Sequence, residues 1–262
     1  MLFVLSPAKT LDFSAPPAWV QATAPELAGD TAKLATVTRR LTHADLRRLM
    51  DISDNLAELN VERFKAFNPK SQDGIQAALA FAGDVYDGLE ARALDEASLG
   101  WAQDHLRILS GLYGVLRPLD RIQAYRLEMG TRLTTDRGAN LYDFWGDRIS
   151  KALNRAAKDH ADPTVVNLAS QEYFGAVDAR ALKSPVLTCQ FKEEKDGDAR
   201  IISFYAKLAR GLMARYAIDH RVERPNDLRG FNAGGYRFSA DLSSPTEWVF
   251  VRPQPLAKAA AE

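Results

Sequence analysis

Residues 1–10 read MLFVLSPAKT, and this stretch decides the fold class. Its apolar run, Leu2 to Leu5, predicts a short buried strand, which the Ser6-Pro7 pair ends. Lys9 and Thr10 then lie on a loop at the carboxyl end of that strand. Open sheets flanked by helices bind ligands at the carboxyl ends of their strands. The stretch therefore predicts a central strand and one edge of a binding site.

Segments farther along the chain predict a mixed fold of the α+β class. Thr164 to Leu168 is rich in β-branched residues and predicts a second strand. Residues 186–191 and 200–204 flank an acidic turn and predict a hairpin, and residues 142–158 predict an amphipathic helix. Because no repeat or low-complexity linker divides the 262 residues, we expect one compact α+β domain. A tail at about residues 254–262 is expected to be frayed.

We also expect a helical insertion at about residues 20–70, and part of it resembles a helix-hairpin-helix element. Thr42 to Asp45 matches the capping box that starts a helix, and Asn60 predicts the start of a second helix after a turn at residues 56–59. The turn amides of such elements contact one DNA phosphate without reading base sequence. The turn usually carries glycine where the phosphate approaches, and residues 56–59 have none. An ordinary helical hairpin is therefore the alternative.

Six arginines and no lysine lie between His105 and Arg137, in HLRILSGLYGVLRPLDRIQAYRLEMGTRLTTDR. Arginine in place of lysine indicates planar, forked recognition of a phosphate, a carboxylate or a base edge. Paired glycines predict a tight turn where the arginines are presented, so we expect Arg107 and Arg117 to contact phosphate. The alternative is that Arg117 simply pairs with Asp120.

A second basic segment is Ser203 to Tyr216, SFYAKLARGLMARY, which contains three cations and no acid. On a helix, Lys207, Arg210 and Gly211 share one face, and glycine lets a phosphate or another backbone come close. We therefore expect Lys207 and Arg210 to contact phosphate, with a solvated basic face as the alternative. In the polar turn at residues 83–88, we expect Asp84 to orient an arginine or a ligand hydroxyl, unless it is only a solvated turn residue.

Composition excludes several classes of protein. The 34 basic and 34 acidic residues cancel, so nucleic acid must be bound through a local patch. Cys189 is the only cysteine, which excludes an intramolecular disulfide and favours a reducing, cytoplasmic location. No apolar run approaches the roughly 20 residues of a membrane-spanning helix, so we expect no membrane partner.

Motifs for metals and common cofactors are missing from the sequence. The loop at residues 6–10 lacks the glycines of a Walker A motif, and no Rossmann fingerprint, HExxH or CxxC motif occurs. A non-haem iron site favours two histidines and a carboxylate, whereas the four histidines of this chain are far apart in sequence. We therefore expect no bound metal and no cofactor.

Several of these segments together resemble one known family. Six motifs stand in matching order along the chain: Ser6 to Leu11 (SPAKTL), Gly83 to Tyr86 (GDVY), Arg107 to Asp120 (RILSGLYGVLRPLD), Tyr125 to Gly130 (YRLEMG), Asn167 to Ser170 with Glu172-Tyr173, and Ser203 to Met213 (SFYAKLARGLM). They resemble the YaaA family of bacterial peroxide-stress-resistance proteins. The resemblance implies a cytosolic protein that helps bacteria survive hydrogen peroxide by keeping free iron low. It also implies non-specific binding of double-stranded DNA, through a positively charged cleft and a helix-hairpin-helix element.

Two hypotheses for function follow. In the first, the chain binds duplex DNA, with phosphate contacts from these residues: Arg107, Arg117, Lys207, Arg210 and Asn60. In the second, it is an enzyme that acts on a nucleotide or a damaged base. Lys9 or Glu172 is then the nucleophile or general base, with Glu128 as a further candidate. The expected cleft around them contains Thr10, Asp84, Tyr86, Arg126, Asn167, Ser170 and Tyr173.

Lys9 separates the two hypotheses most sharply. On an exposed loop its ammonium group keeps its ordinary charge, whereas burial beside Arg117 or Lys207 makes it nucleophilic. The oligomeric state is left open by the sequence.

Overall fold

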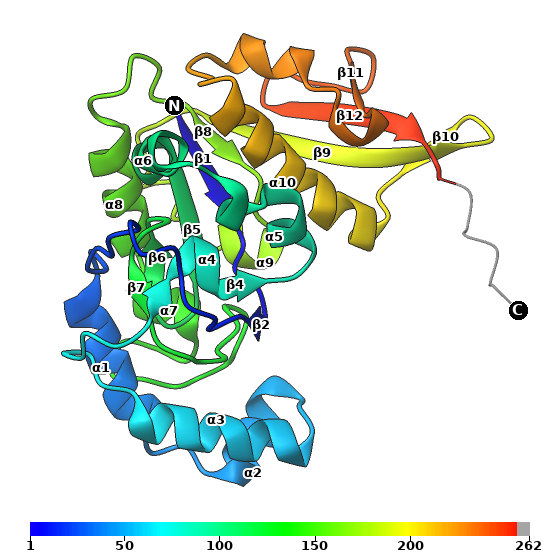
Figure 1. Ribbon diagram of the computed structural model, residues 1–262. Coiled ribbons are helices and arrows are strands. Elements are labelled where there is room, and N and C mark those ends of the chain that lie inside the picture. Colours follow the sequence, from blue (N-terminus) through cyan, green and yellow to red (C-terminus); the bar gives the residue numbers. More distant parts are fainter. Residues whose placement is uncertain (256–262) are drawn as a thin grey trace, which may run out of the picture.

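The computed structural model describes residues 1–255, and a mostly parallel central sheet runs through it (Figure 1). The strands stand in the order β11-β12-β9-β8-β1-β5-β6, and β10 pairs with β9. Their bounds are β1 (Leu2–Leu5), β5 (Leu106–Ser110), β6 (Gly114–Leu116), β8 (Val165–Asn167), β9 (Val186–Lys195), β10 (Asp198–Arg200), β11 (Arg237–Ser239) and β12 (Glu247–Pro253). The expected frayed tail lies almost entirely outside the described residues.

Strand β1 is fully buried at the middle of the sheet. It runs parallel to β5 on one side and to β8 on the other, so that Val4 is paired with both Arg107 and Asn167. The parallel order continues from β8 through β9 to β12. Near-continuous apolar strands are typical of parallel sheets covered on both faces. The mixed fold predicted from Leu2–Leu5 and Thr164–Leu168 is confirmed.

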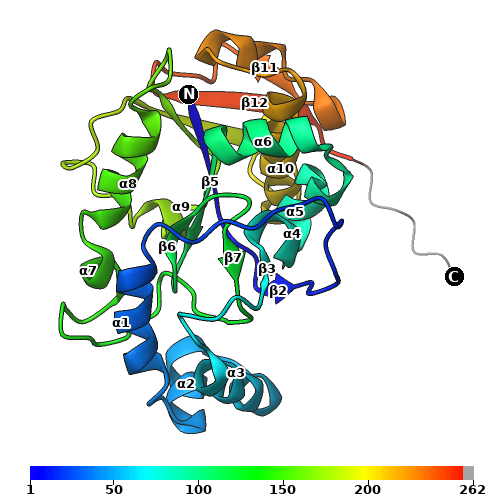
Figure 2. The ribbon, with the colours of Figure 1, turned by 60° about the vertical axis from the view of Figure 1, so that its left-hand side comes forward.

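Helices cover both faces of this sheet, and Figures 1 and 2 agree on their placement. Helices α6, α8 and α10 all contact β1, and the two views show α6 and α10 on one face of the sheet and α8 on the other. The helices are α1 (Ala28–Thr38), α2 (His43–Met50), α3 (Asp54–Ala66), α4 (Ala77–Ala80), α5 (Asp84–Leu89), α6 (Glu96–His105), α7 (Leu141–Trp145), α8 (Arg148–Ala157), α9 (Gln171–Phe174) and α10 (Ser203–Asp219). Three short 3₁₀ segments are η1 (Ala91–Ala93), η2 (Pro225–Gly230) and η3 (Ala233–Gly235). Two small ladders pair β2 (Thr10–Leu11) with β4 (Phe81–Ala82), and β3 (Ile75–Gln76) with β7 (Arg121–Ile122).

Two glycines let α5 and α10 cross in close contact. A Cβ added to Gly211 would lie 1.8 Å from the carbonyl oxygen of Val85, and one added to Gly88 would lie 2.4 Å from that of Leu208. Backbone therefore meets backbone at this crossing. The face of α10 that contains Gly211 packs against α5, so it is not open to a phosphate.

The expected helical hairpin is present, but its turn lies elsewhere. The capping box at Thr42 and Asp45 starts α2 as predicted. Helix α2 ends at Asp51, which adopts a left-handed conformation, and α3 begins at Asp54. Residues 56–59 are thus helical, and Asn60 lies inside α3 instead of starting a helix. The pair α2 and α3 lies at the end of the molecule farthest from β12 (Figures 1 and 2), and its glycine-free turn gives no support to a helix-hairpin-helix assignment.

Three further sequence predictions need correction. The second strand expected at residues 200–204 ends at Arg200, because α10 begins at Ser203. The helix expected over residues 142–158 is broken at Gly146, whose positive φ of 49° ends α7 before α8 begins. The polar turn expected at residues 83–88 is mostly the helix α5, which follows Gly83 at φ 135°.

Candidate functional site

The carboxyl ends of β1, β5 and β8 meet at one edge of the sheet, and serines line that edge. Ser6, directly after β1, accepts a hydrogen bond through Oγ from the backbone N–H of Ser170 at 2.9 Å. Asn167, at the end of β8, accepts one through Oδ1 from the N–H of Ala169 at 2.9 Å. These bonds fix the path of the chain as it leaves the two strands. Asn167 therefore shapes the loop, and its side chain is buried.

Three buried tyrosines converge on this edge. The Tyr86 hydroxyl donates to the carbonyl oxygen of Ser6 at 3.0 Å, and the hydroxyls of Tyr125 and Ser110 are 2.6 Å apart. Burial raises the pKa of Tyr86, Tyr125 and Tyr173, and the neighbouring Tyr125 adds to the rise for Tyr86 and for Tyr173. All three phenols are consequently neutral hydrogen-bond donors at physiological pH. The Tyr173 phenol lies beside the backbone N–H of Met129, a contact that opposes the rise of its pKa.

A carboxylate between two cations forms the open part of the site. Lys9 Nζ lies 2.9 Å from Glu128 Oε2, and Arg126 Nη2 lies 2.9 Å from Glu128 Oε1. The Lys9 side chain is 62% exposed. Lys9 is therefore an exposed, paired cation, and the alternative in which it is buried beside Arg117 or Lys207 is wrong.

Glu172 closes the site from the side of α9. Its Oε1 accepts a hydrogen bond from the backbone N–H of Gly130 at 2.9 Å. A Cβ at Gly130 would lie 3.3 Å from the same oxygen, so a larger residue would crowd this contact. Ser170 occupies the N-cap position of α9, where its Oγ accepts from the N–H of Tyr173. Glu172 thereby ties the segment that carries Glu128 to the end of β8.

The α5–α10 crossing contributes one more charge pair. Asp84, the first residue of α5, lies 3.9 Å from Lys207 Nζ on α10. Thr10 is exposed on β2, which pairs with β4, and β4 leads directly to Gly83 and Asp84. The structure thus places most of the residues expected to line the cleft near one another, and they come from four separate segments of the chain.

Two of the expected phosphate contacts are engaged inside the protein. Arg107 is only 9% exposed, and its Nη1 donates to the carbonyl oxygens of Gln103 and Leu106. Burial, and then the charge of Arg117, lowers the pKa of Arg107 to about 10. Arg117 binds the fully buried carboxylate of Asp120 through Nε and Nη2, at 3.1 and 2.8 Å. The structural alternative for Arg117 is therefore confirmed, and the expectation that Arg107 contacts phosphate is corrected.

Arg210 and Asn60 are also poorly placed for phosphate. Burial lowers the pKa of Arg210, and its Nε is buried with no hydrogen-bond partner among the described residues. Asn60 is fully buried in α3, where its Nδ2 donates to the carbonyl oxygen of Leu56 at 2.7 Å. Of the five expected contacts, only Lys207 presents an exposed cation.

The structure contains a basic groove that the sequence did not indicate, and it is lined by residues of α1, α2 and the segment at residues 132–136. Two adjoining hollows share Val37, Arg40 and Thr134, and together they run along α1, α2 and the segment at residues 132–136. The cations that line them are Lys33, Arg40, Arg48 and Arg132. Lys33 lies on α1, and Arg40 lies in the turn that follows the end of α1 at Thr38. The sequence contains no local signal for this groove, because Arg132 is distant from Lys33 and Arg40 along the chain.

Two of the four histidines meet at the opposite end of β1. The rings of His105 and His160 are 4.5 Å apart, and the Met1 amino group lies 2.7 Å from His160 Nδ1. Burial lowers the pKa of both imidazoles and of the amino group. These two histidines are far apart in the sequence but adjacent in the structure. Over residues 1–255, no group of three or more His, Cys, Asp or Glu side chains is arranged to hold a metal ion.

Comparison with known proteins decides the family. Residues 1–242 match the family described as peroxide stress protein YaaA. The chain belongs to the YaaA family. It is 65% identical over 261 residues to a UPF0246 protein of Phenylobacterium zucineum, a match that spans 100% of this chain and 98% of that relative. UPF0246 proteins of Caulobacter sp. (66% over 255 residues, 97% of this chain and 100% of the relative) and Maricaulis maris (54% over 257 residues, 98% of each) are similar along the same length.

Membership of the YaaA family raises the question of peroxide chemistry at the only cysteine. Cys189 is buried on β9, and burial raises the pKa of its thiol to about 12. The thiolate is the form that reacts with peroxide, and this thiol stays protonated. Burial therefore disfavours the thiolate of Cys189, and with it the reaction with peroxide, in the folded chain. Within residues 1–255, none of the helices combines the length and the apolar character needed to cross a bilayer.

Proposed function

We propose that this YaaA-family chain protects cells from peroxide by binding double-stranded DNA non-specifically in the cytoplasm and so limiting iron-dependent oxidative damage. The observation that carries the proposal is the groove formed by α1, α2 and residues 132–136. Three of its cations, Lys33, Arg40 and Arg132, are exposed and take part in no ion pair within residues 1–255. Cations without a protein partner are available to phosphate oxygens.

The composition of the groove favours backbone contact over base reading. Its remaining polar groups include the hydroxyls of Thr134 and Thr135, which can donate to phosphate oxygens, whereas the Thr36 hydroxyl already donates to the carbonyl oxygen of Lys33. Among the described residues that line it, Asp136 is the only one with a carboxylate. Such a surface positions a duplex without distinguishing its sequence, and its binding weakens steeply with salt. Lys207, on a different element, remains a candidate for an additional phosphate contact.

The test is the affinity for a fluorescent DNA duplex over a series of salt concentrations. Reversing two groove charges, with Arg40→Glu and Arg132→Glu together, should reduce the slope of log affinity against log salt by about 2. The matched control is Lys158→Glu with Lys183→Glu, which makes the same change of net charge at exposed residues outside the groove. An equal loss of affinity in both double variants would mean that total charge matters and the groove does not.

A second candidate function is catalysis on a nucleotide or a damaged base, at the edge formed by β1 and β8. The observation that favours it is the Lys9–Glu128–Arg126 arrangement close to the phenol of Tyr173. A carboxylate held by two cations and a neutral phenol donor together resemble a proton-transfer site more than a phosphate groove. In this function Lys9 or Glu172 acts on the substrate. Lys9→Ala should then abolish peroxide protection while duplex binding stays at the wild-type level.

A further inference from the structure

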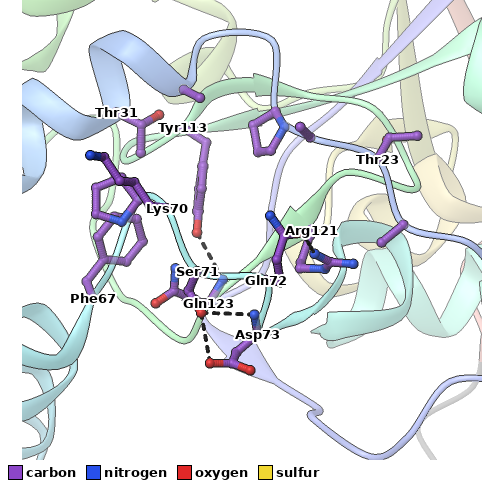
Figure 3. Close-up of a pocket in the computed structure, with 15 residues that line it drawn as sticks. Thr23, Thr31, Phe67, Lys70, Ser71, Gln72, Asp73, Tyr113, Arg121 and Gln123 are labelled. Atoms are coloured by element: carbon purple, nitrogen blue, oxygen red, sulfur yellow. Dashed lines mark hydrogen bonds between the residues drawn. The ribbon is translucent and has the colours of Figure 1, made fainter.

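A separate cavity of about 320 Å³ lies between α1, residues 67–73 and the segment that contains Tyr113 and Arg121. Figure 3 shows the Tyr113 side chain among the lining residues, with Phe67 and Lys70 on one side of it and Arg121 on the other. This volume is at the lower end of the range found for small-molecule sites. The cavity uses part of the arginine-rich stretch, but not the groove or the Lys9 site.

The floor of the cavity is mostly apolar, and it contains one hydroxyl without a hydrogen-bond partner among the described residues. The rings of Phe67 and Tyr113 are 5.9 Å apart and nearly perpendicular, and Pro25 and Pro69 extend the apolar surface. Thr31 lines the same cavity and is only 2% exposed, yet its hydroxyl oxygen has no hydrogen-bond partner within residues 1–255. An unpaired buried hydroxyl is costly, so its persistence beside a cavity points to a ligand that pairs with it.

The rim of the cavity carries positive charge. Lys70 is exposed and takes part in no ion pair among the described residues, and Arg121 donates one N–H to the side-chain oxygen of Gln72. The other N–H groups of the Arg121 guanidinium are available for an anion. Asp73, the one carboxylate at the rim, accepts a hydrogen bond from Ser71 at 2.8 Å. Two cations therefore face one carboxylate.

We propose that this cavity binds a single nucleotide. Its planar base packs on the apolar floor and pairs with the Thr31 hydroxyl, and its phosphate contacts Lys70 and Arg121. Each part of the cavity then has a complementary part in the ligand. The nucleotide is either free or part of single-stranded DNA; only the second source rests on the proposed DNA binding. Thr31 lines the cavity and not the groove, whereas Arg40, just after the end of α1, lines the groove and not the cavity, so the two sites are separable by mutation.

The experiment is calorimetric titration of the full-length protein with the four deoxynucleoside 5′-monophosphates and, separately, with a short single-stranded oligonucleotide. Thr31→Val keeps the shape of the side chain and removes the unpaired hydroxyl, so thermal stability should be equal or higher while nucleotide affinity falls about tenfold. Lys70→Ala should lower the affinity about tenfold as well, through loss of a charged contact. Lys65→Ala, an exposed lysine of α3 outside the cavity, is the matched control and should bind as the wild type does.

The source of the nucleotide follows from which ligand shows these effects. Sensitivity of monophosphate binding to both substitutions supports a free nucleotide. The same sensitivity with the oligonucleotide alone supports single-stranded DNA. Failure of both ligands to bind at millimolar concentration, or binding that neither substitution weakens, would overturn the proposal. Duplex binding through the groove is measured independently, so loss of one function does not imply loss of the other.

Discussion

At the scale of single residues, an arginine is informative only when its partner is known. The sequence predicted that Arg117 contacts phosphate, but its guanidinium group donates hydrogen bonds to the carboxylate of Asp120, three residues away. Arg107 is likewise occupied, by backbone carbonyl groups. Among the cations that line the groove, Lys33, Arg40 and Arg132 are exposed and take part in no ion pair within the described residues. Charge counted along the sequence does not show which cations are already paired.

Asp120 is predicted to be structurally indispensable. Its fully buried carboxylate accepts hydrogen bonds from the Thr23 hydroxyl, the Arg117 N–H and the Arg117 guanidinium. Asp120→Ala leaves these donors unpaired, so the free energy of unfolding should fall by about 3–5 kcal/mol. Urea denaturation measures this. Asp198→Ala, which removes an exposed pair with Arg200, should cost less than about 1 kcal/mol. Equal effects of the two substitutions would contradict the role given to Asp120.

The group formed by Met1, His105 and His160 predicts a pH dependence of stability. Burial lowers the pKa of all three groups in the folded chain. Between the lowered pKa and the ordinary pKa, each group is therefore protonated in the unfolded chain and mostly unprotonated in the folded chain. Stability should therefore decrease as pH falls below about 8 for the amino group and further below about 6.5 for the imidazoles. The decrease should stop once the pH is below the folded pKa values.

Urea midpoints at pH 8 and pH 5.5 measure this effect. His160→Gln should make the decrease smaller, whereas His220→Gln should leave it unchanged, because His220 is exposed. The carboxylates with lowered pKa, such as Asp45 and Asp95, are outside this window, since their ordinary pKa is 3.8. A midpoint that is the same at the two pH values in the wild type would contradict the prediction.

At the scale of elements, the crossing of α5 and α10 positions the Asp84–Lys207 pair, and glycine makes it possible. Gly211→Ala places a methyl group against the Val85 carbonyl, so we expect a loss of at least about 1–3 kcal/mol of stability. Gly29→Ala is the matched control: this glycine lies in α1 with nothing within 4 Å of an added Cβ, and alanine there should stabilise the chain by about 0.4–1 kcal/mol. Thermal unfolding of the two variants measures both effects. Destabilisation of the same size in both would contradict this account of the crossing.

Elements defined by local signals were predictable from the sequence, and elements defined by distant contacts were not. The strand Leu2–Leu5 and the capping box at Thr42 depend on neighbouring residues, and both were found. The start of α3 was misplaced because Asn60 resembles a cap, although its side chain instead bonds to the preceding helical turn. Residues 83–88 have turn composition, but packing against α10 makes most of them helical. Tertiary contact thus overrode local propensity.

At the scale of the whole molecule, the sequence predicted those candidate-site residues that lie along the carboxyl edge of the sheet. Ser170, Glu172 and Tyr173 were placed at the end of a strand, and the parallel order of β1 and β8 brings them beside Lys9 and Glu128. The basic groove was not predicted, because it joins α1 to residues nearly one hundred positions later. The mixed fold and the family were correctly inferred from the sequence, and duplex binding remains the proposal to be tested.

Survival of hydrogen peroxide by cells that lack their own copy of this protein tests the central claim most directly. The cells receive the wild type, the groove variant (Arg40→Glu with Arg132→Glu), Lys9→Ala, or the control Lys158→Glu with Lys183→Glu, each at equal protein level. If protection depends on the groove, the groove variant should be as sensitive as cells without the protein, while Lys9→Ala and the control protect fully. Full protection by the groove variant would contradict the account, and loss of protection in Lys9→Ala alone would assign the function to the site at the sheet edge.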